Sequence, residues 1–208
     1  MSKYIGPSCR ICRREGMKLF LKGTKCTTPK CPVSKRTFPP GQHGKRRIKL
    51  SDYGVQLREK QKLRKTYGLL EQQFKHYFRI ASQSKGVTGE ILLQLLERRL
   101  DNVVFRLGFA FSRSHARQVV RHGLVTVDGK KVDLPSYFVK TGSKIGIRPQ
   151  EKIQIQVRKT LEAVKERGTP SWLELDSEKL TGTVLRLPGK QDSQIPVQEQ
   201  LIVELYSK

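Results

Sequence analysis

Four cysteines near the N-terminus limit most strongly what this chain can fold into. They stand at Cys9, Cys12, Cys26 and Cys31, a C-x2-C-x13-C-x4-C spacing, and the chain has no others. Residues 1–46 around them are rich in Lys, Arg, Gly and Pro and poor in apolar residues, so this segment cannot bury a core of its own. Two close pairs separated by a loop can place four thiolates around one tetrahedral Zn²⁺. The spacing therefore predicts a zinc knuckle that organises this segment.

Other uses of the four thiols stay open at this point. Four cysteines also hold an iron–sulfur cluster, and the spacing does not distinguish that cluster from zinc. Free thiols without a metal are the remaining alternative. Disulfides are disfavoured, because the sequence shows neither the apolar stretch of a signal peptide nor a run long enough to span a membrane, which indicates a reducing, cytoplasmic compartment.

Positive charge is concentrated in the first part of the chain. The 208 residues contain 42 Lys and Arg against 18 Asp and Glu, a formal net charge of +24. Residues 1–85 hold 22 basic and 4 acidic side chains, residues 86–149 hold 11 and 5, and residues 150–208 hold 9 and 9. A basic excess can simply keep a surface solvated. An excess confined to one part of the chain instead predicts a polyanionic partner, and without a membrane-binding segment that partner is nucleic acid.

Apolar periodicity and capping residues predict an α+β protein of short helices with a small sheet. Helices are expected from Ser51, as N-cap, to about Tyr67; from about Leu70 to Ala81; from Thr88 to about Leu107; from Ser112, as N-cap, to about His122; and near 157–167. A hairpin is expected over 124–132 with Asp128-Gly129 as its turn, further short strands including 146–148, and a strand-like C-terminal segment, 201–206, that returns to the helical part.

The helix that begins after Ser112 carries three arginines on one face. Arg113, Arg117 and Arg121 are spaced by four residues, so their side chains lie about a turn apart and can follow a phosphate backbone. The backbone N–H groups of the first turn can bind a further phosphate. The alternative interpretation is a solvated helix face.

Residues 97–141 resemble the S4 RNA-binding domain. The resemblance rests on the segments 97–108 (ERRLDNVVFRLG), 112–123 (SRSHARQVVRHG), 127–129 (VDG) and 132–137 (VDLPSY). The cysteine segment, Arg46-Arg47 leading into residues 53–62, and the ending at 201–208 extend the resemblance to the whole bacterial family of small-subunit ribosomal proteins S4. Many members of that family lack the cysteines, so the metal is a lineage feature and not a family requirement.

The resemblance implies an architecture and a set of partners. It implies a metal-binding extension over 1–46, a helical RNA-binding domain over 47–97 joined by 187–208, and an S4 domain over 98–186. It also implies a non-enzymatic ribosomal constituent that binds a multi-helix junction of small-subunit ribosomal RNA, nucleates assembly, contacts neighbouring ribosomal proteins, and influences decoding accuracy and the mRNA entry site. Neither a homo-oligomer nor a membrane partner is expected.

The candidate RNA-binding residues are those whose side chains suit phosphate contact or hydrogen bonding to bases, and they lie in the basic extension, in the helix after Ser51 and in the helix after Ser112. They are Arg10, Arg13, Arg14, Lys22, Lys30, Lys35, Arg36, His43, Lys45, Arg46, Arg47, Lys49, Arg58, Lys60, Gln61, Lys62, Arg64, Lys65, Tyr67, Ser112, Arg113, His115, Arg117 and Arg121.

Two other classes of function compete with this interpretation. An RNA-modifying enzyme could use the S4 domain to hold its substrate, but the sequence contains no P-loop, H-E-x-x-H or nucleophile elbow. A zinc-dependent DNA-binding regulator would normally present a reading helix from its knuckle, and a preference for duplex DNA over structured RNA would identify it.

Overall fold

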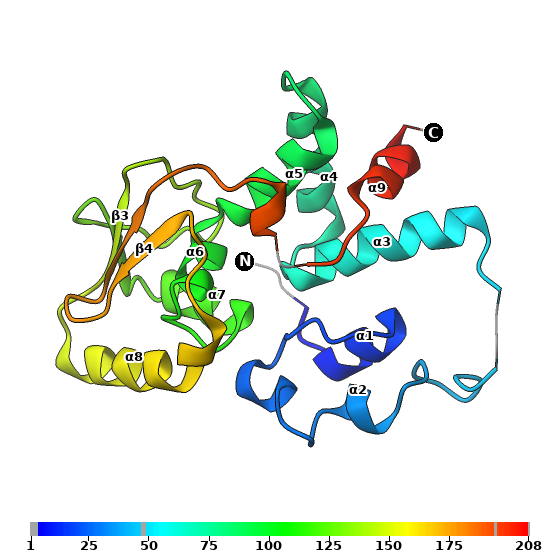
Figure 1. Ribbon diagram of the computed structural model, residues 1–208, viewed down its shortest axis with the longest axis horizontal. Coiled ribbons are helices and arrows are strands. Elements are labelled where there is room, and N and C mark those ends of the chain that lie inside the picture. Colours follow the sequence, from blue (N-terminus) through cyan, green and yellow to red (C-terminus); the bar gives the residue numbers. More distant parts are fainter. Residues whose placement is uncertain (1–3, 47–48, 194, 208) are drawn as a thin grey trace. The chain divides into compact units, whose positions relative to one another are not determined.

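The chain separates into two compact units in the computed structural model, which describes residues 4–46, 49–193 and 195–207. One unit comprises Met1–Leu92 together with Ile195–Lys208, and the other comprises Leu93–Gln194. The boundary falls inside α5 (Thr88–Glu97) (Figure 1). The three-part division expected from the sequence is finer than these two units and stays a prediction.

The first unit is helical. Ser51 caps α3 as expected, because its hydroxyl accepts a hydrogen bond from the N–H of Gly54 at 3.2 Å. Gly68, with φ 67°, ends the same helix in the left-handed region. The unit contains α1 (Ser8–Glu15), the 3₁₀ turn η1 (Gly23–Cys26), α2 (Pro32–Lys35), α3 (Asp52–Thr66), α4 (Glu71–Gln83) and α9 (Glu199–Tyr206).

The C-terminal segment is the helix α9 and not the strand-like piece expected. Its side chains pack against α3 and α4: Ile202 is fully buried, and Tyr206 stacks on Phe78 with ring centroids 4.4 Å apart. Gln56 of α3 donates to Glu204 at 2.9 Å. The apolar residues of 201–206 do not alternate with polar ones, and a helix brings one face of them onto α3 while its own backbone stays hydrogen-bonded.

The single helix expected from Thr88 to Leu107 was wrong, because the chain breaks at Arg99 into α5 and α6 (Leu100–Arg106). Arg99 has the extended angles φ −64° and ψ 136°. Here the backbone pairs with a distant segment: Leu100 N–H donates to the Tyr137 carbonyl at 2.8 Å, and Val139 N–H donates to the Arg98 carbonyl at 3.0 Å. These bonds replace the helical ones that the apolar pattern predicted.

The second unit packs α6, α7 (Arg113–Arg121) and α8 (Glu151–Val164) against a five-stranded antiparallel sheet in the order β2-β1-β3-β5-β4 (Figure 1). Trp172 and Ile145 are fully buried in its core. Gly182 in β5 is needed at the contact with α6, because a Cβ there would lie 2.4 Å from Leu107. The remaining elements are β1 (Val125–Val127), β2 (Lys130–Lys131), β3 (Lys144–Ile147), η2 (Lys165–Arg167), β4 (Leu173–Asp176), β5 (Thr181–Val184) and η3 (Lys190–Asp192).

Several sequence expectations for this unit are confirmed. The fold is α+β, and Asp128 and Gly129 have the positive φ values, 50° and 80°, of a type I′ hairpin turn. The helix expected near 157–167 begins six residues earlier, at Glu151, and ends in the 3₁₀ turn η2. Within the described residues, no helix combines the length and the hydropathy that a membrane crossing requires.

Candidate nucleic-acid interface

The four cysteines lie around one small hollow in the first unit. Helix α1 carries Cys9 and Cys12, η1 ends at Cys26, and Cys31 precedes α2 as its N-cap residue, and all four line the same pocket. Cys12, Cys26 and Cys31 are each at most 7 % exposed, and all four thiols are free. The fold therefore places the four cysteines, which come from three separate segments, along the lining of one hollow.

Burial is the largest influence on the protonation of these thiols. Burial raises the pKa of the Cys12 and Cys26 thiols, and the neighbouring thiols raise it further. Backbone N–H groups oppose this effect, since Lys22 N–H donates to the Cys26 sulfur at 3.4 Å. Across residues 4–46, 49–193 and 195–207, no three His, Cys, Asp or Glu side chains meet in the arrangement of a formed metal site.

Around the cysteines, most of the candidate RNA-binding side chains are exposed. Arg13 is half-buried, because its guanidinium donates to the carbonyls of Phe38 and Pro39 at 3.1 and 3.2 Å. Arg47 lies outside the described residues. The exposed members of this group are Arg10, Arg14, Lys22, Lys30, Lys35, Arg36, His43, Lys45, Arg46 and Lys49.

The basic side chains of α3 are engaged largely within the first unit. Arg58 forms an ion pair with Glu15 at 3.1 Å, and Lys60, only 9 % exposed, pairs with Glu71 at 2.7 Å. Arg64 reaches the same Glu71 at 3.4 Å. These carboxylates come from α1 and α4, so packing supplies partners that the α3 sequence does not contain.

Three further candidates on α3 are half-buried and have partners within the first unit. Lys62 pairs with Glu59, one turn away. Gln61 accepts hydrogen bonds from Arg64, and Lys65 lies 4.5 Å from the centre of the Tyr4 ring.

Tyr67, proposed as a base contact, is 3 % exposed and belongs to the core of the unit. It offers no open ring face for stacking in this conformation.

Helix α7 has the buried apolar face that the sequence predicts, but its three arginines differ in exposure. Ala116 and Val120 are fully buried against the second unit's core. Arg113 and Arg117 are half-buried, whereas Arg121 is exposed and 3.5 Å from Asp133. Because both partners of that pair are about half exposed, it holds Arg121 only weakly.

The N-terminus of α7 has the expected Ser112 cap and, in addition, a stacked pair of rings. Ser112 caps the helix by accepting from His115 N–H at 3.2 Å. The His115 ring stacks on Phe111, with ring centroids 5.9 Å apart, and burial lowers the pKa of this histidine. The imidazole is therefore held more neutral than a free histidine at the same pH.

One basic residue near this interface was missed by the sequence reasoning. Arg167, at the end of η2, lies with its guanidinium 4.2 Å from the centre of the Phe105 ring in α6. Nothing in the spacing of the sequence joins these two residues. Only the packing of α8 and η2 beside α6 brings them together.

Comparison with known proteins shows which class of protein the chain belongs to. Residues 98–145 match the S4 domain model, and residues 3–97 match the model described as the ribosomal protein S4/S9 N-terminal domain. The chain is thus an S4-domain protein whose first unit is of the ribosomal S4/S9 type.

Similarity over the full length then defines the family. The chain is 58% identical to the small ribosomal subunit protein uS4 of Citrifermentans bemidjiense, 59% to that of Geotalea daltonii and 56% to that of Dictyoglomus turgidum, each over 208 residues and 100% of both chains. The chain belongs to the uS4 family of small ribosomal subunit proteins.

Proposed function

We propose that this chain is a structural constituent of the small ribosomal subunit that binds ribosomal RNA directly. The observation that carries the proposal is the full-length similarity to uS4 proteins, combined with a charge of +24. Its neighbours are other ribosomal proteins, its place is the ribosome in the cytoplasm, and it is not an enzyme. The exposed basic side chains of the N-terminal extension and the arginines of α7, of which Arg121 is exposed and Arg113 and Arg117 are half-buried, supply phosphate contacts. Such contacts suit A-form RNA, because its deep major groove is closed to side chains.

Finer roles follow from this function. The protein binds a junction of several RNA helices, and exposed basic side chains on both units support this role. Early binding at such a junction would nucleate assembly. We also propose that the protein influences decoding accuracy and contacts mRNA at the entry channel. It acts as a single copy and not as a homo-oligomer.

Titration of the purified chain with a small-subunit ribosomal RNA junction fragment tests the proposal. A scrambled RNA of equal length serves as competitor, at several salt concentrations. Tight binding that survives the competitor and weakens steeply with salt is the expected result. Equal affinity for both RNAs would contradict it, and so would a preference for duplex DNA, which the DNA-binding alternative predicts.

We further propose that Cys9, Cys12, Cys26 and Cys31 bind one Zn²⁺. The shared pocket and the N–H donor to the Cys26 sulfur suit a four-thiolate site, because hydrogen bonds to sulfur stabilise the thiolate form. The metal would supply the folding free energy that a segment with so little apolar core lacks.

Metal analysis of the purified protein tests the zinc site. We expect about one zinc per chain, and loss of that zinc together with helical circular dichroism in the C12S/C26S double variant. T24S, an exposed change in the same 3₁₀ turn, should retain the metal. Finding iron together with visible absorption would indicate an iron–sulfur cluster in place of zinc. A metal-free wild-type protein would mean that the thiols are free. Either result overturns the proposal.

A further inference from the structure

The ring of Phe105 is shared by two arginines from different parts of the second unit. The guanidinium carbon of Arg113, at the start of α7, lies 4.5 Å from the ring centre, and that of Arg167, at the end of η2, lies 4.2 Å from it. Phe105 is only 5 % exposed, so the ring is fixed in the core. A buried ring therefore gathers two permanent cations into one place.

Arg167 is held by neutral groups. Its two Nη atoms donate to the carbonyl oxygens of Phe105 and Phe111 at 3.3 and 3.1 Å. Within the described residues, no carboxylate lies at ion-pair distance from Arg167. A guanidinium has five N–H donors, so after two carbonyl contacts it keeps donors for another acceptor.

Arg113 is oriented by a buried network. Its Nε donates to the Oδ1 atom of Asn102 at 2.8 Å, while the Nδ2 atom of Asn102 donates to the backbone carbonyl and carboxylate of Glu97 at 3.0 and 2.6 Å. Because the amide nitrogen faces two acceptors, the amide oxygen must face Arg113. Asn102 and Glu97 are each 1 % exposed, which fixes the direction of the arginine.

The surrounding charge is unfavourable for Arg167 on its own. Burial lowers the pKa of its guanidinium, and the nearby charges of Arg113 and Arg106 lower it further. Arg106 is compensated by Glu97 at 2.7 Å. An anion beside Arg167 and Arg113 would relieve the like-charge repulsion that folding creates there.

We propose that Arg113 and Arg167, which both lie against the ring of Phe105, bind one phosphate group of the ribosomal RNA backbone. This inference rests on the proposed function and adds a residue from outside the matched S4 domain segment, 98–145. Paired guanidinium forks suit the several oxygens of a phosphodiester, because each fork can donate to two of them.

Binding of the junction RNA to full-length variants tests the site. R167Q should weaken binding about tenfold, as for the loss of one charge-assisted contact, and should reduce the log–log salt slope by roughly 0.9. R167K keeps the charge and should keep the salt slope while losing affinity. If both arginines hold one phosphate, R113Q/R167Q should lose less affinity than the two single variants together.

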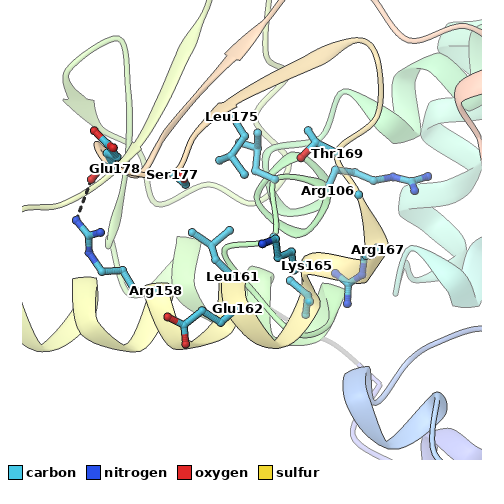
Figure 2. A pocket seen from close by; sticks show the side chains of 14 residues that line it. Arg106, Arg158, Leu161, Glu162, Lys165, Arg167, Thr169, Leu175, Ser177 and Glu178 are labelled. Atoms are coloured by element: carbon cyan, nitrogen blue, oxygen red, sulfur yellow. Dashed lines mark hydrogen bonds between the residues drawn. The ribbon is translucent and has the colours of Figure 1, made fainter.

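Arg158 supplies the matched control. Figure 2 shows Arg158 and Arg167 at opposite ends of the pocket of about 460 Å³ between α8 and β4, with Arg158 bonded to the Glu178 carbonyl at 2.8 Å. R158Q removes the same charge from the same unit and should change affinity much less. Equal losses in R158Q and R167Q, or additive losses in the double variant, would overturn the shared phosphate site.

Two further readouts separate the causes of failure. Thermal unfolding of each variant is measured beside binding, and R167K decides the result if R167Q is unfolded. A wild type that does not prefer the junction RNA would contradict the proposed function itself. A wild type that prefers it, with R167Q binding equally well, would overturn the Arg113–Arg167 site alone.

Discussion

At the scale of single residues, the second unit contains a buried ion pair between Glu97 and Arg106. Glu97 and Arg106 are 1 % and 4 % exposed, and Arg106 donates to both oxygens of Glu97, at 3.1 and 2.7 Å. Asn102 donates to the same carboxylate. A charge removed from water this completely needs its partner, because the interior offers it no solvation.

The variant E97Q should therefore destabilise the protein by about 3–5 kcal/mol, since it leaves Arg106 buried with a neutral partner. Chemical denaturation monitored by Trp172, which is buried in the same core, measures the loss. D133N, at the exposed pair with Arg121, is the control and should cost no more than about 1 kcal/mol. Similar losses for the two variants would show that burial does not govern the pair at Glu97.

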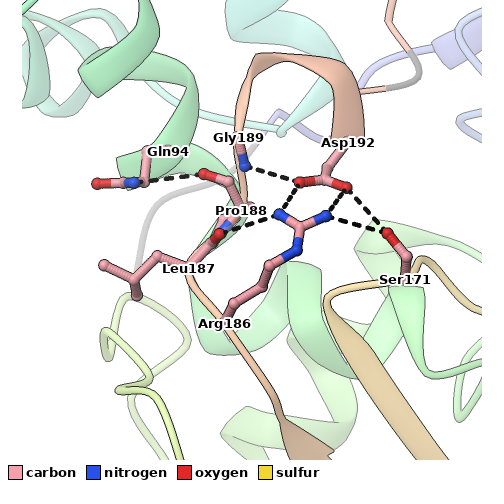
Figure 3. Close-up of polar contacts among 7 residues, drawn as sticks. All are labelled: Gln94, Ser171, Arg186, Leu187, Pro188, Gly189 and Asp192. Atoms are coloured by element: carbon pink, nitrogen blue, oxygen red, sulfur yellow. Dashed lines mark hydrogen bonds and ion pairs between the residues drawn. The ribbon is translucent and has the colours of Figure 1, made fainter.

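At the scale of elements, the short turn η3 lies near the C-terminal end of the second unit and is held by a cluster of polar contacts. Figure 3 shows the guanidinium of Arg186, which donates to both carboxylate oxygens of Asp192 at 2.7 and 2.9 Å. Arg186 also donates to the hydroxyl of Ser171, and the N–H of Gly189 donates to Asp192. Gln94 donates to the carbonyl of Pro188 at 3.3 Å. This cluster ties residues 186–192 to the beginning of β4.

Asp192 gives this cluster a dependence on pH. Burial works against its ionisation, but the hydrogen bonds from Arg186 and Gly189 outweigh burial, and the pKa of Asp192 lies below its ordinary value. A carboxyl whose pKa is lowered by folding stabilises the folded state above the unfolded pKa of about 3.9, and this contribution is lost as pH falls through the folded pKa. We expect D192N to speed amide hydrogen exchange over 186–193 at pH 7.

The stability difference between D192N and the wild type should shrink as pH falls below about 4, where the wild-type carboxyl also loses its charge. Denaturation midpoints at a series of pH values measure it. D176N is a control for position: Asp176, at the end of β4, also has a lowered pKa because it accepts from the N–H of Lys179, but it lies outside this cluster, so D176N should leave amide exchange over 186–193 unchanged. A difference between D192N and the wild type that stays constant with pH would contradict an ionic role for Asp192.

At the scale of the whole molecule, the two units use their charge differently. In the first unit, much of the basic charge of α3 is paired with Glu15 and Glu71, while the extension around the cysteines leaves its basic side chains exposed. In the second unit, Arg113 and Arg117 of α7 are half-buried, and the exposed basic side chains, Arg121 among them, are spread over several elements. The basic charge that stays unpaired is therefore smaller than the sequence charge of +24 suggests, because ion pairs within the first unit use part of it.

The sequence by itself determined the features that depend on neighbours in the chain. Ser51 and Ser112 as caps, Gly68 as a stop and Asp128-Gly129 as a turn follow from local backbone preferences, which act within a few residues. The long resemblance to ribosomal S4 proteins also lay in the sequence, and the full-length relatives confirm it. The metal and the RNA contacts stay predictions.

Only the tertiary structure decided the features that depend on distant partners. The helix break at Arg99 exists because the backbone at 98–101 pairs with 135–139, and an apolar stripe cannot reveal that competition. The C-terminal segment forms the helix α9 because its apolar face packs against α3. Arg167 reached Phe105 because η2 packs beside α6. In each case the free energy comes from contacts between residues far apart in sequence, which no local pattern records.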